Sequence, residues 1–290
     1  MAESSLPPLV NPAANTGLLE VFRRRYLLKL LVRREISARY SGSVLGFLWS
    51  YIQPAVRLLM FYFVFQILIE RGHGMENFAI HLFCGLVVVH YFTETFGAGT
   101  RSIVANRKIV QKMSLPREMF PVASMLVSAY HVIPGLLLLL ATSALLGWRP
   151  DWVGMGALVL GFAIVSVLGL ALALIFSVAN VIFRDFGRIV QTLNQFVTFS
   201  VPMIYPYTMV EERFKDFAPY YLWNPVAEAV LLVQRAVWIG TNSDPVEAAK
   251  HHLPDNLWQL GFIHLGIALV LLVIAQAVFN RLETKIPELL

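Results

Sequence analysis

VGMGALVLGFAIVSVLGLALALIFSVANVI, residues Val153–Ile182, is the stretch that decides the fold class, because its 30 residues carry no charge. A helix needs about 20 mostly apolar residues to cross roughly 30 Å of hydrocarbon. The rest of the chain has the same character: 57% of the 290 residues are hydrophobic and 14% are charged, whereas a soluble domain is about 25% charged. The sequence therefore predicts an all-α integral membrane protein.

Five further apolar stretches have the length of a membrane span. The six predicted transmembrane helices are Phe47–Ile69, Phe78–Thr100, Phe120–Leu146, Val153–Ile182, Ile189–Tyr207 and Leu257–Phe279. Pro134 lies inside the third, where neighbouring helices can satisfy the freed backbone carbonyl. We expect a flexible tail over residues 1–17 and one transmembrane domain over residues 18–290, with both termini on the same side.

The connections between the predicted spans differ in charge. Sixteen Lys and Arg residues fall on the side of the two termini, six fall on the other side, and Arg57 lies within a span. The terminal side holds Arg23, Arg24, Arg25, Lys29, Arg33, Arg34, Arg39, Arg101, Arg107, Lys108, Lys112, Arg117, Arg184, Arg188, Arg281 and Lys285. Since cytoplasmic loops are rich in Lys and Arg, both termini are expected in the cytoplasm. The same bias accounts for the pI of about 9.4 without a nucleic-acid partner.

Residues 18–43 predict an amphipathic helix before the first span. Leu19, Phe22, Tyr26 and Leu30 recur at helical spacing, and Arg and Lys occupy the other face. A basic amphipathic helix beside a span is typical of the cytoplasmic membrane interface. A simple stop-transfer cluster of charges is the alternative.

Residues 202–239, between the fifth and sixth predicted spans, form what we call the outer gate segment. Its prolines predict short rigid pieces, because proline breaks helices, and Val226–Ile239 predicts a helix too short to cross the membrane. Glu211, Glu212, Arg213 and Lys215 are expected in a polar turn between two pieces. We interpret the segment as re-entrant helices that close a path from outside, with six candidate gate residues: Tyr207, Tyr220, Tyr221, Trp223, Glu228 and Arg235.

Polar residues recur every three or four positions along three predicted spans, so each set shares one helix face. Charged and polar groups at membrane depth normally face a partner or a water-filled path, and aromatic rings nearby suit the C–H faces of sugars. The candidate path residues are Ser50, Gln53, Arg57, Gln191, Gln195, Thr198, Phe199 and Tyr205. A second set contains His90 and Glu94, and Glu94 is expected to pair with Arg57. Packing of the helices through small and polar residues is the alternative interpretation.

The sequence carries no signature of catalysis. None of its six lysines follows a glycine, so no P-loop for ATP is present, and its five aspartates are isolated from one another. The single cysteine, Cys84, excludes an intrachain disulfide, and the pair His251–His252 lacks nearby ligands for a metal site. We therefore expect a protein that is not an enzyme and binds no metal or other cofactor.

Four blocks of sequence resemble the ABC-2 type polysaccharide exporter permeases. LVRREISARYSGSVLGFLW (31–49), followed by Pro54, is similar to the family's entry signature, and NRKIVQKMSLPRE (106–118) to its first cytoplasmic loop. FRDFG (183–187), leading to SVPMIY (200–205), resembles the second loop and the fifth helix, and Trp223–Pro225 resembles the outer gate helices. The resemblance covers about residues 20–280.

The resemblance implies a homodimer in the plasma (inner) membrane, bound to two copies of a separate P-loop ATPase that holds ATP and Mg. It implies a lipid-linked polysaccharide as cargo, and a mycobacterial galactan exporter subunit is the nearest suspected match. The loop that docks on the ATPase would contain Arg107, Lys108, Ile109, Met113, Leu115, Pro116 and Arg117. The basic helix suits a lipid diphosphate headgroup, since Arg makes forked contacts with phosphate; its candidate residues are Arg33, Arg34, Arg39 and Tyr40. Ordinary membrane lipid would explain that helix too.

Three other functions remain open on the residues alone. An ion-coupled or passive flippase would need no ATPase partner, and His90, Glu94 and Arg57 could then relay protons. An enzyme acting on lipid-linked sugar would need a carboxylate or histidine cluster that we do not find. An ABC-2 exporter of another amphipathic cargo would share every feature described above. Co-purification with a P-loop ATPase would separate the exporters from the first two.

Overall fold

The computed structural model describes residues 17–64, 75–113, 115–283 and 286–289. Within these residues the chain is helical and has no strand, as predicted. The α-helices are α1 Leu18–Arg23, α2 Arg25–Tyr40, α3 Trp49–Phe61, α4 Phe78–Ala105, α5 Arg107–Lys112, α6 Met119–Leu145, α7 Trp152–Ile182, α8 Phe186–Phe199, α9 Tyr207–Phe214, α10 Ala218–Tyr221, α11 Pro225–Ala236, α12 Pro245–His252, α13 Leu257–Leu282 and α14 Ile286–Leu289. The predicted tail up to residue 16, the end of the first predicted span at 65–69, and Lys285 lie outside the described residues.

Five helices of the described chain are long and apolar enough to cross a membrane. They are the helical stretch Gly46–Val64, which contains α3, and the helices α4, α6, α7 and α13. Each coincides with one of the predicted spans, so the prediction of a multi-pass helical membrane protein is confirmed. Pro134 lies inside α6 without ending it.

The fifth predicted span, Ile189–Tyr207, does not form one long helix. Its helical part is α8, with 14 residues, which at 1.5 Å per residue covers about 21 Å of the roughly 30 Å needed. Residues 200–206 are irregular, and Pro202 and Pro206 explain the break because proline cannot continue a helix. Five of the six predicted transmembrane helices are therefore confirmed, and at this element one unbroken helix over Ile189–Tyr207 is not found.

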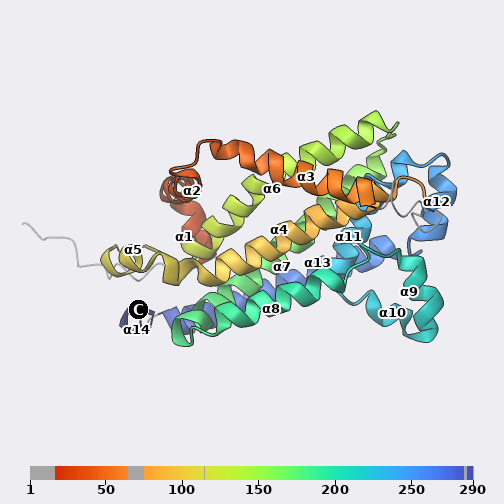
Figure 1. Ribbon diagram of the computed structural model, residues 1–290. Helices are drawn as coiled ribbons and strands as arrows, with labels where there is room; N and C mark the ends of the chain where they lie inside the picture. The colour runs from red at the N-terminus through yellow and green to blue at the C-terminus, as the bar shows by residue number, and fades with distance from the viewer. Residues whose placement is uncertain (1–16, 65–74, 114, 284–285, 290) are drawn as a thin grey trace, which may run out of the picture.

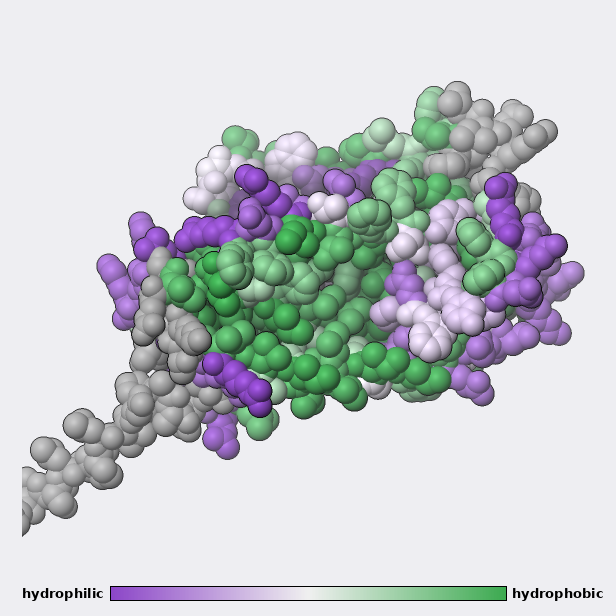
Figure 2. Space-filling view, turned by 90° about the horizontal axis from the view of Figure 1, so that it is seen from below, coloured by the Kyte–Doolittle hydropathy of each residue, from purple (hydrophilic) through white to green (hydrophobic). Residues whose placement is uncertain are grey.

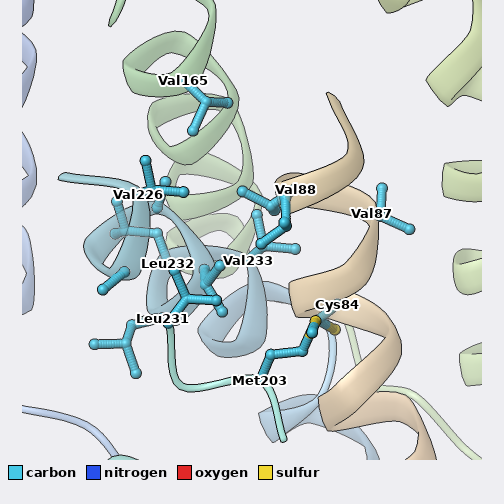
Figure 3. Packing of buried hydrophobic residues seen from close by; sticks show 14 of the residues in the cluster. Cys84, Val87, Val88, Val165, Met203, Val226, Leu231, Leu232 and Val233 are labelled. Atoms are coloured by element: carbon cyan, nitrogen blue, oxygen red, sulfur yellow. The ribbon is translucent and has the colours of Figure 1, made fainter. Parts of the chain in front are cut away.

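Helix α4 lies at the centre of the bundle and packs on α6, α7, α8 and α11. Small residues allow this close approach: a Cβ added at Gly99 of α4 would lie 2.5 Å from the Cβ of Ala173 of α7. At the other end of α4, Cys84 and Val88 pack with Val233 of α11 and with Met203 in one buried apolar cluster (Figure 3). The core thus runs along the whole length of α4.

The two ends of the bundle carry different elements (Figure 1). Helices α5 and α14 lie at one end, which we call the α5 end, and α9, α10 and α12 lie at the opposite end, which we call the α12 end. Figure 2 shows a broad apolar zone on one face of the molecule, with hydrophilic residues gathered toward both ends. This zoning is what a protein surrounded by hydrocarbon requires.

The N-terminal amphipathic segment is two helices rather than one. Helix α1 ends at Arg23, α2 begins at Arg25 and ends at Tyr40, so the helix predicted for residues 18–43 is interrupted and shorter. The predicted apolar side chains, Leu19, Phe22, Tyr26 and Leu30, are exposed. A different set, Val21, Leu28 and Leu31, is buried against the bundle. Apolar side chains therefore face both the protein and the surroundings, which suits a helix in contact with lipid.

The outer gate segment consists of short helices, as predicted. However, Glu211, Glu212 and Arg213 belong to α9 and not to a polar turn; the turn comes at Lys215, which adopts a positive φ of 42°. The predicted helix Val226–Ile239 is α11, which begins at Pro225 and ends at Ala236. It is buried along nearly its full length against α7 and α4, so this segment is a packed part of the fold.

Candidate functional site

A polar cavity of about 270 Å³ lies between α3, α4 and α6. Three of the predicted path residues, Ser50, Gln53 and Arg57 of α3, line it. These positions are three and four residues apart, so one face of α3 presents all three side chains. His90 of α4 and His131 of α6 face the same space, which makes it a polar chamber among long apolar helices.

Glu94 of α4 forms its ion pair with Arg39 of α2, at 2.7 Å between Oε1 and Nη1. The predicted partner was Arg57, and no ion pair of Arg57 occurs among the described residues; the expected pairing is therefore wrong. The reason is that α2 brings an arginine from 55 residues earlier in the chain to the face of α4 that carries Glu94. The position of a residue along its helix predicts its depth in the membrane, but it does not predict which neighbouring helix packs against the face that carries the residue.

The predicted headgroup residues lie along α2 but have different surroundings. Arg34 donates to the Asn106 side chain at 2.8 Å and lies 3.7 Å from Glu35, whereas Arg33 is exposed. Tyr40 forms hydrogen bonds with the hydroxyl of Ser50 and with Nδ1 of His131, the latter at 2.8 Å. The end of α2 is therefore fastened to α3 and α6 at the wall of the polar cavity.

The remaining path residues lie on another face of the protein, along α8 (Figure 1). Val190 of α8 is buried, and Asn194 donates to the carbonyl of Thr93 at 3.0 Å, which fixes the helix on α4. Gln191, Gln195 and Phe199 are exposed. The last two predicted path residues form hydrogen bonds within the same copy. Thr198 donates to the carbonyl of Asn194, and Tyr205 bonds the carbonyl of Phe199 and the hydroxyl of Tyr221. A single copy therefore does not bring the α3 set and the α8 set together.

Helix α11 is fixed at both ends. Asn224 caps its N-terminus by accepting from the backbone N–H groups of Val226 and Ala227. Near its C-terminus, Arg235 forms a forked pair with Asp151 at 2.9 and 3.3 Å. Trp148 donates from Nε1 to the carbonyl of Ala236 at 3.0 Å. The connection between α6 and α7 thus holds α11 in place.

Glu228 is the least expected of the predicted gate residues, because its carboxyl group is buried. Its side chain has no exposed surface, and neither carboxyl oxygen has a hydrogen-bond partner. Burial raises the pKa of Glu228 from its usual 4.5 to about 8. Burial also raises the pKa of Tyr207 and Tyr221, and the nearby Glu211 carboxylate adds to the shift at Tyr207. Two other gate residues, Tyr220 and Trp223, are exposed.

The predicted docking loop contains a short helix, α5, at the α5 end of the bundle. Arg107, Lys108 and Met113 are exposed, whereas Ile109 and Leu115 are half-buried. Pro116 is buried, and Arg117 donates to the backbone carbonyl of Glu283. The helix ends at Lys112, four residues before Pro116. The exposed part of the loop therefore combines three cations, since Lys112 is also exposed, with one large apolar side chain, Met113.

Two groups of residues were missed by sequence reasoning. One is His131, whose bond to Tyr40 joins α2 to α6. The other is a set of three arginines, Arg101, Arg184 and Arg188, that line one cavity at the α5 end. All three counted as charges that indicate orientation, and Arg101 and Arg188 also belong to the polar faces predicted on the second and fifth spans, but no pattern in the sequence brought the three together. Helical spacing relates Arg184 to Arg188 but gives no sign that Arg101 lies beside them.

Comparisons with known proteins identify the family of this chain. The ABC-2 type transporter family model matches residues 26–235. The O-antigen export system permease protein RfbA of Myxococcus xanthus is 27% identical over 273 residues, which are 93% of this chain and 97% of the relative. An RfbA of Klebsiella pneumoniae is 25% identical over 91% of this chain and 95% of the relative. The polysialic acid transport protein KpsM of Escherichia coli is 23% identical over 77% of this chain and 85% of the relative. Since the family model matches well over half of the chain, the protein belongs to the ABC-2 type transporter family.

Proposed function

We propose that this protein is the membrane permease of an ATP-driven exporter of lipid-linked polysaccharide. The observation that carries the proposal is the similarity, over more than 90% of both chains, to permeases named for O-antigen export. A polysialic acid transport protein is similar over 77% of this chain. As an ABC-2 permease it has no ATPase domain, and ATP with Mg belongs to a partner ATPase. Galactan is the cargo we favour within this class, on the sequence resemblance described above.

The working unit in this proposal is a homodimer with two ATPase copies. The exposed amides of Gln191 and Gln195 support a second copy, because hydrocarbon offers no hydrogen-bond partner to polar groups. A second copy placed against α8 would enclose these side chains in a shared path. The α3 side chains Gln53 and Arg57 would then line the part of the path nearer α2.

The remaining assignments follow the excess of Lys and Arg on one side. We place the α5 end and both termini in the cytoplasm of the plasma (inner) membrane, with α5 against the ATPase. Helix α2 would lie in the cytoplasmic interface, where Arg33 is free to contact a lipid diphosphate. The outer gate segment, with the buried α11, would close the path on the far side.

Reconstitution tests the proposal directly. The permease and a P-loop ATPase from the same organism are placed in vesicles with a lipid-linked polysaccharide on the outer leaflet. We expect the two proteins to co-purify, and ATP to drive the glycan to the lumen. Transport that proceeds equally without ATP, or a permease that retains no ATPase, would contradict the proposal and favour a passive or ion-coupled flippase.

A further inference from the structure

A cavity of about 440 Å³ lies at the α5 end of the bundle, between α4, α7 and α8. Its walls carry three arginines, namely Arg101 of α4, Arg184 in the connection between α7 and α8, and Arg188 of α8. Asn180 and Gln191 add two amides. No residue of α2 lines this cavity; the α2 arginines Arg34 and Arg39 instead contact Asn106 and Glu94.

Asn180 holds the three walls of the cavity together. It donates from Nδ2 to the carbonyl of Thr100 on α4 at 3.3 Å and accepts from the backbone N–H of Gly187 at 2.9 Å. A Cβ added at Gly187 would lie 3.2 Å from the Asn180 side-chain oxygen, so the chain approaches closely here. The arginines therefore lie around a fastened junction of three helices.

The cavity carries positive charge without compensation from the described part of the chain. No carboxylate there forms an ion pair with any of the three arginines; the nearest acid in the sequence is Asp185, which is exposed. By contrast, Arg34 and Arg39 of α2 lie beside Glu35 and Glu94. The N-cap residue of α8 is Asp185, whose carboxylate offsets the partial positive charge of the helix N-terminus, so the excess of positive charge comes from the three arginines. Such a site attracts an anion.

We propose that this cavity binds the phosphate or diphosphate group of a lipid, beside the polar face of α8. We further infer that the bound lipid enters the transport path at this cavity. That part of the inference rests on the proposed function, because that function has the path run along α8. Arginine makes forked hydrogen bonds with phosphate oxygens, and three of them can surround one such group. Gln191 lies in the cavity wall and also on the exposed face of α8, so it connects the site to the path.

Binding of inorganic pyrophosphate tests the site without knowledge of the cargo. The permease is placed in nanodiscs of phosphatidylcholine, and its affinity for pyrophosphate is measured by calorimetry. We expect Arg188→Gln and Arg101→Gln each to weaken binding about tenfold, because a hydrogen bond to a charged group is lost. Arg281→Gln is the matched control, since Arg281 is exposed near the end of α13 at the same end of the molecule.

One further variant separates binding from folding, and a competition experiment identifies the lipid. Arg188→Lys keeps the positive charge but loses the forked pair of N–H donors, so it should bind pyrophosphate with an affinity between those of the wild type and Arg188→Gln. This variant tests the site even if the glutamine variants are unstable. Competition identifies the source of the phosphate: displacement of pyrophosphate in nanodiscs that contain phosphatidylglycerol indicates bulk anionic lipid. Persistence of pyrophosphate binding there indicates a preference for diphosphate.

Two results would overturn the inference. One is an unchanged pyrophosphate affinity in variants whose thermal unfolding matches the wild type. The other is loss of ATPase co-purification with unchanged pyrophosphate affinity, which would assign the arginines to contact with the ATPase. Neither result touches the proposed function, which depends on ATP-driven export.

Discussion

At the scale of single residues, the structure differs most from expectation where charges are buried. Glu228 lies without a hydrogen-bond partner among apolar residues of α4, α7 and α11. An ionised carboxylate in such a place costs free energy, so the native state favours the protonated form. The pKa of about 8 therefore links the stability of this region to pH.

The first prediction is that the permease loses stability as the pH rises. The folded-state pKa of Glu228 is raised from 4.5 to about 8, so its contribution is complete below about pH 4.5 and is lost as the pH rises through 8. Glu228→Gln should remove this dependence and raise the free energy of unfolding at pH 8 by about 1–3 kcal/mol. Thermal unfolding in detergent between pH 5 and 9 measures both effects.

The exposed Glu212 provides the control for this experiment. Glu212→Gln should leave the pH profile of the wild type intact. A Glu228→Gln variant whose unfolding temperature follows the wild-type profile would show that Glu228 does not cause the dependence.

The second prediction concerns the ion pair between Arg39 and Glu94. Their side chains are 45% and 25% exposed, so solvent weakens the interaction, and Glu94→Gln should lower stability by only about 1 kcal/mol. A double-mutant cycle should show coupling between Arg39→Gln and Glu94→Gln, and near-additivity between Arg57→Gln and Glu94→Gln. The reverse pattern in thermal unfolding would restore Arg57 as the partner of Glu94.

At the scale of elements, long hydrophobic stretches determine where the helices form, and small residues determine where two helices pack closely. Long apolar runs gave the positions of α4, α6, α7 and α13 to within a few residues, because only a helix satisfies its backbone in hydrocarbon. The sequence did not reveal that α8 ends at Phe199 or that α2 begins anew at Arg25. The end of α8 has a local cause in Pro202 and Pro206, which the hydropathy of the stretch outweighed in the prediction, and the bonds of Asn224 to the backbone and hydroxyl oxygens of Ser200 hold the chain there.

The third prediction tests the joint between α4 and α7. Gly99→Val should destabilise the protein by about 1–3 kcal/mol, because even a Cβ there would lie 2.5 Å from Ala173 and an overpacked core strains its neighbours. Gly266→Val in α13 is the matched control, since a Cβ at Gly266 meets nothing within 4 Å. Equal unfolding temperatures for the two variants would show that close packing at Gly99 is unimportant.

The fourth prediction tests α5 and its flank as the docking element. Met113 is 51% exposed, and an aspartate there should weaken contact with an apolar groove of the ATPase. Met113→Asp should reduce ATP-driven export at least tenfold while the permease remains inserted in the membrane. Val246→Asp, at an apolar residue 66% exposed in α12 at the opposite end, should export normally. Full export by the Met113 variant would exclude docking through this side chain.

At the scale of the whole molecule, one copy of the chain leaves polar side chains of α8 exposed. Its α8 contacts only α4 and α7 strongly and leaves polar amides on an open face. The helical membrane class was predictable from the sequence, because hydropathy is a sum over many residues. The arrangement of the candidate path residues was not, because those of α3 and those of α8 lie on different faces of one copy; in the proposed homodimer a partner copy brings such faces together.

The last prediction is that two copies meet along α8. The chain has a single cysteine, Cys84, which is fully buried, so a newly introduced cysteine reports on its own position. Gln195→Cys should give a covalent dimer on mild oxidation in membranes, because the exposed amide at this position needs a polar or protein neighbour rather than hydrocarbon. Val270→Cys is the matched control: it lies on α13, is 61% exposed, and is an apolar residue suited to contact lipid. A dimer formed by Val270→Cys but not by Gln195→Cys would place the interface on α13 and would require a different path from the one proposed along α8.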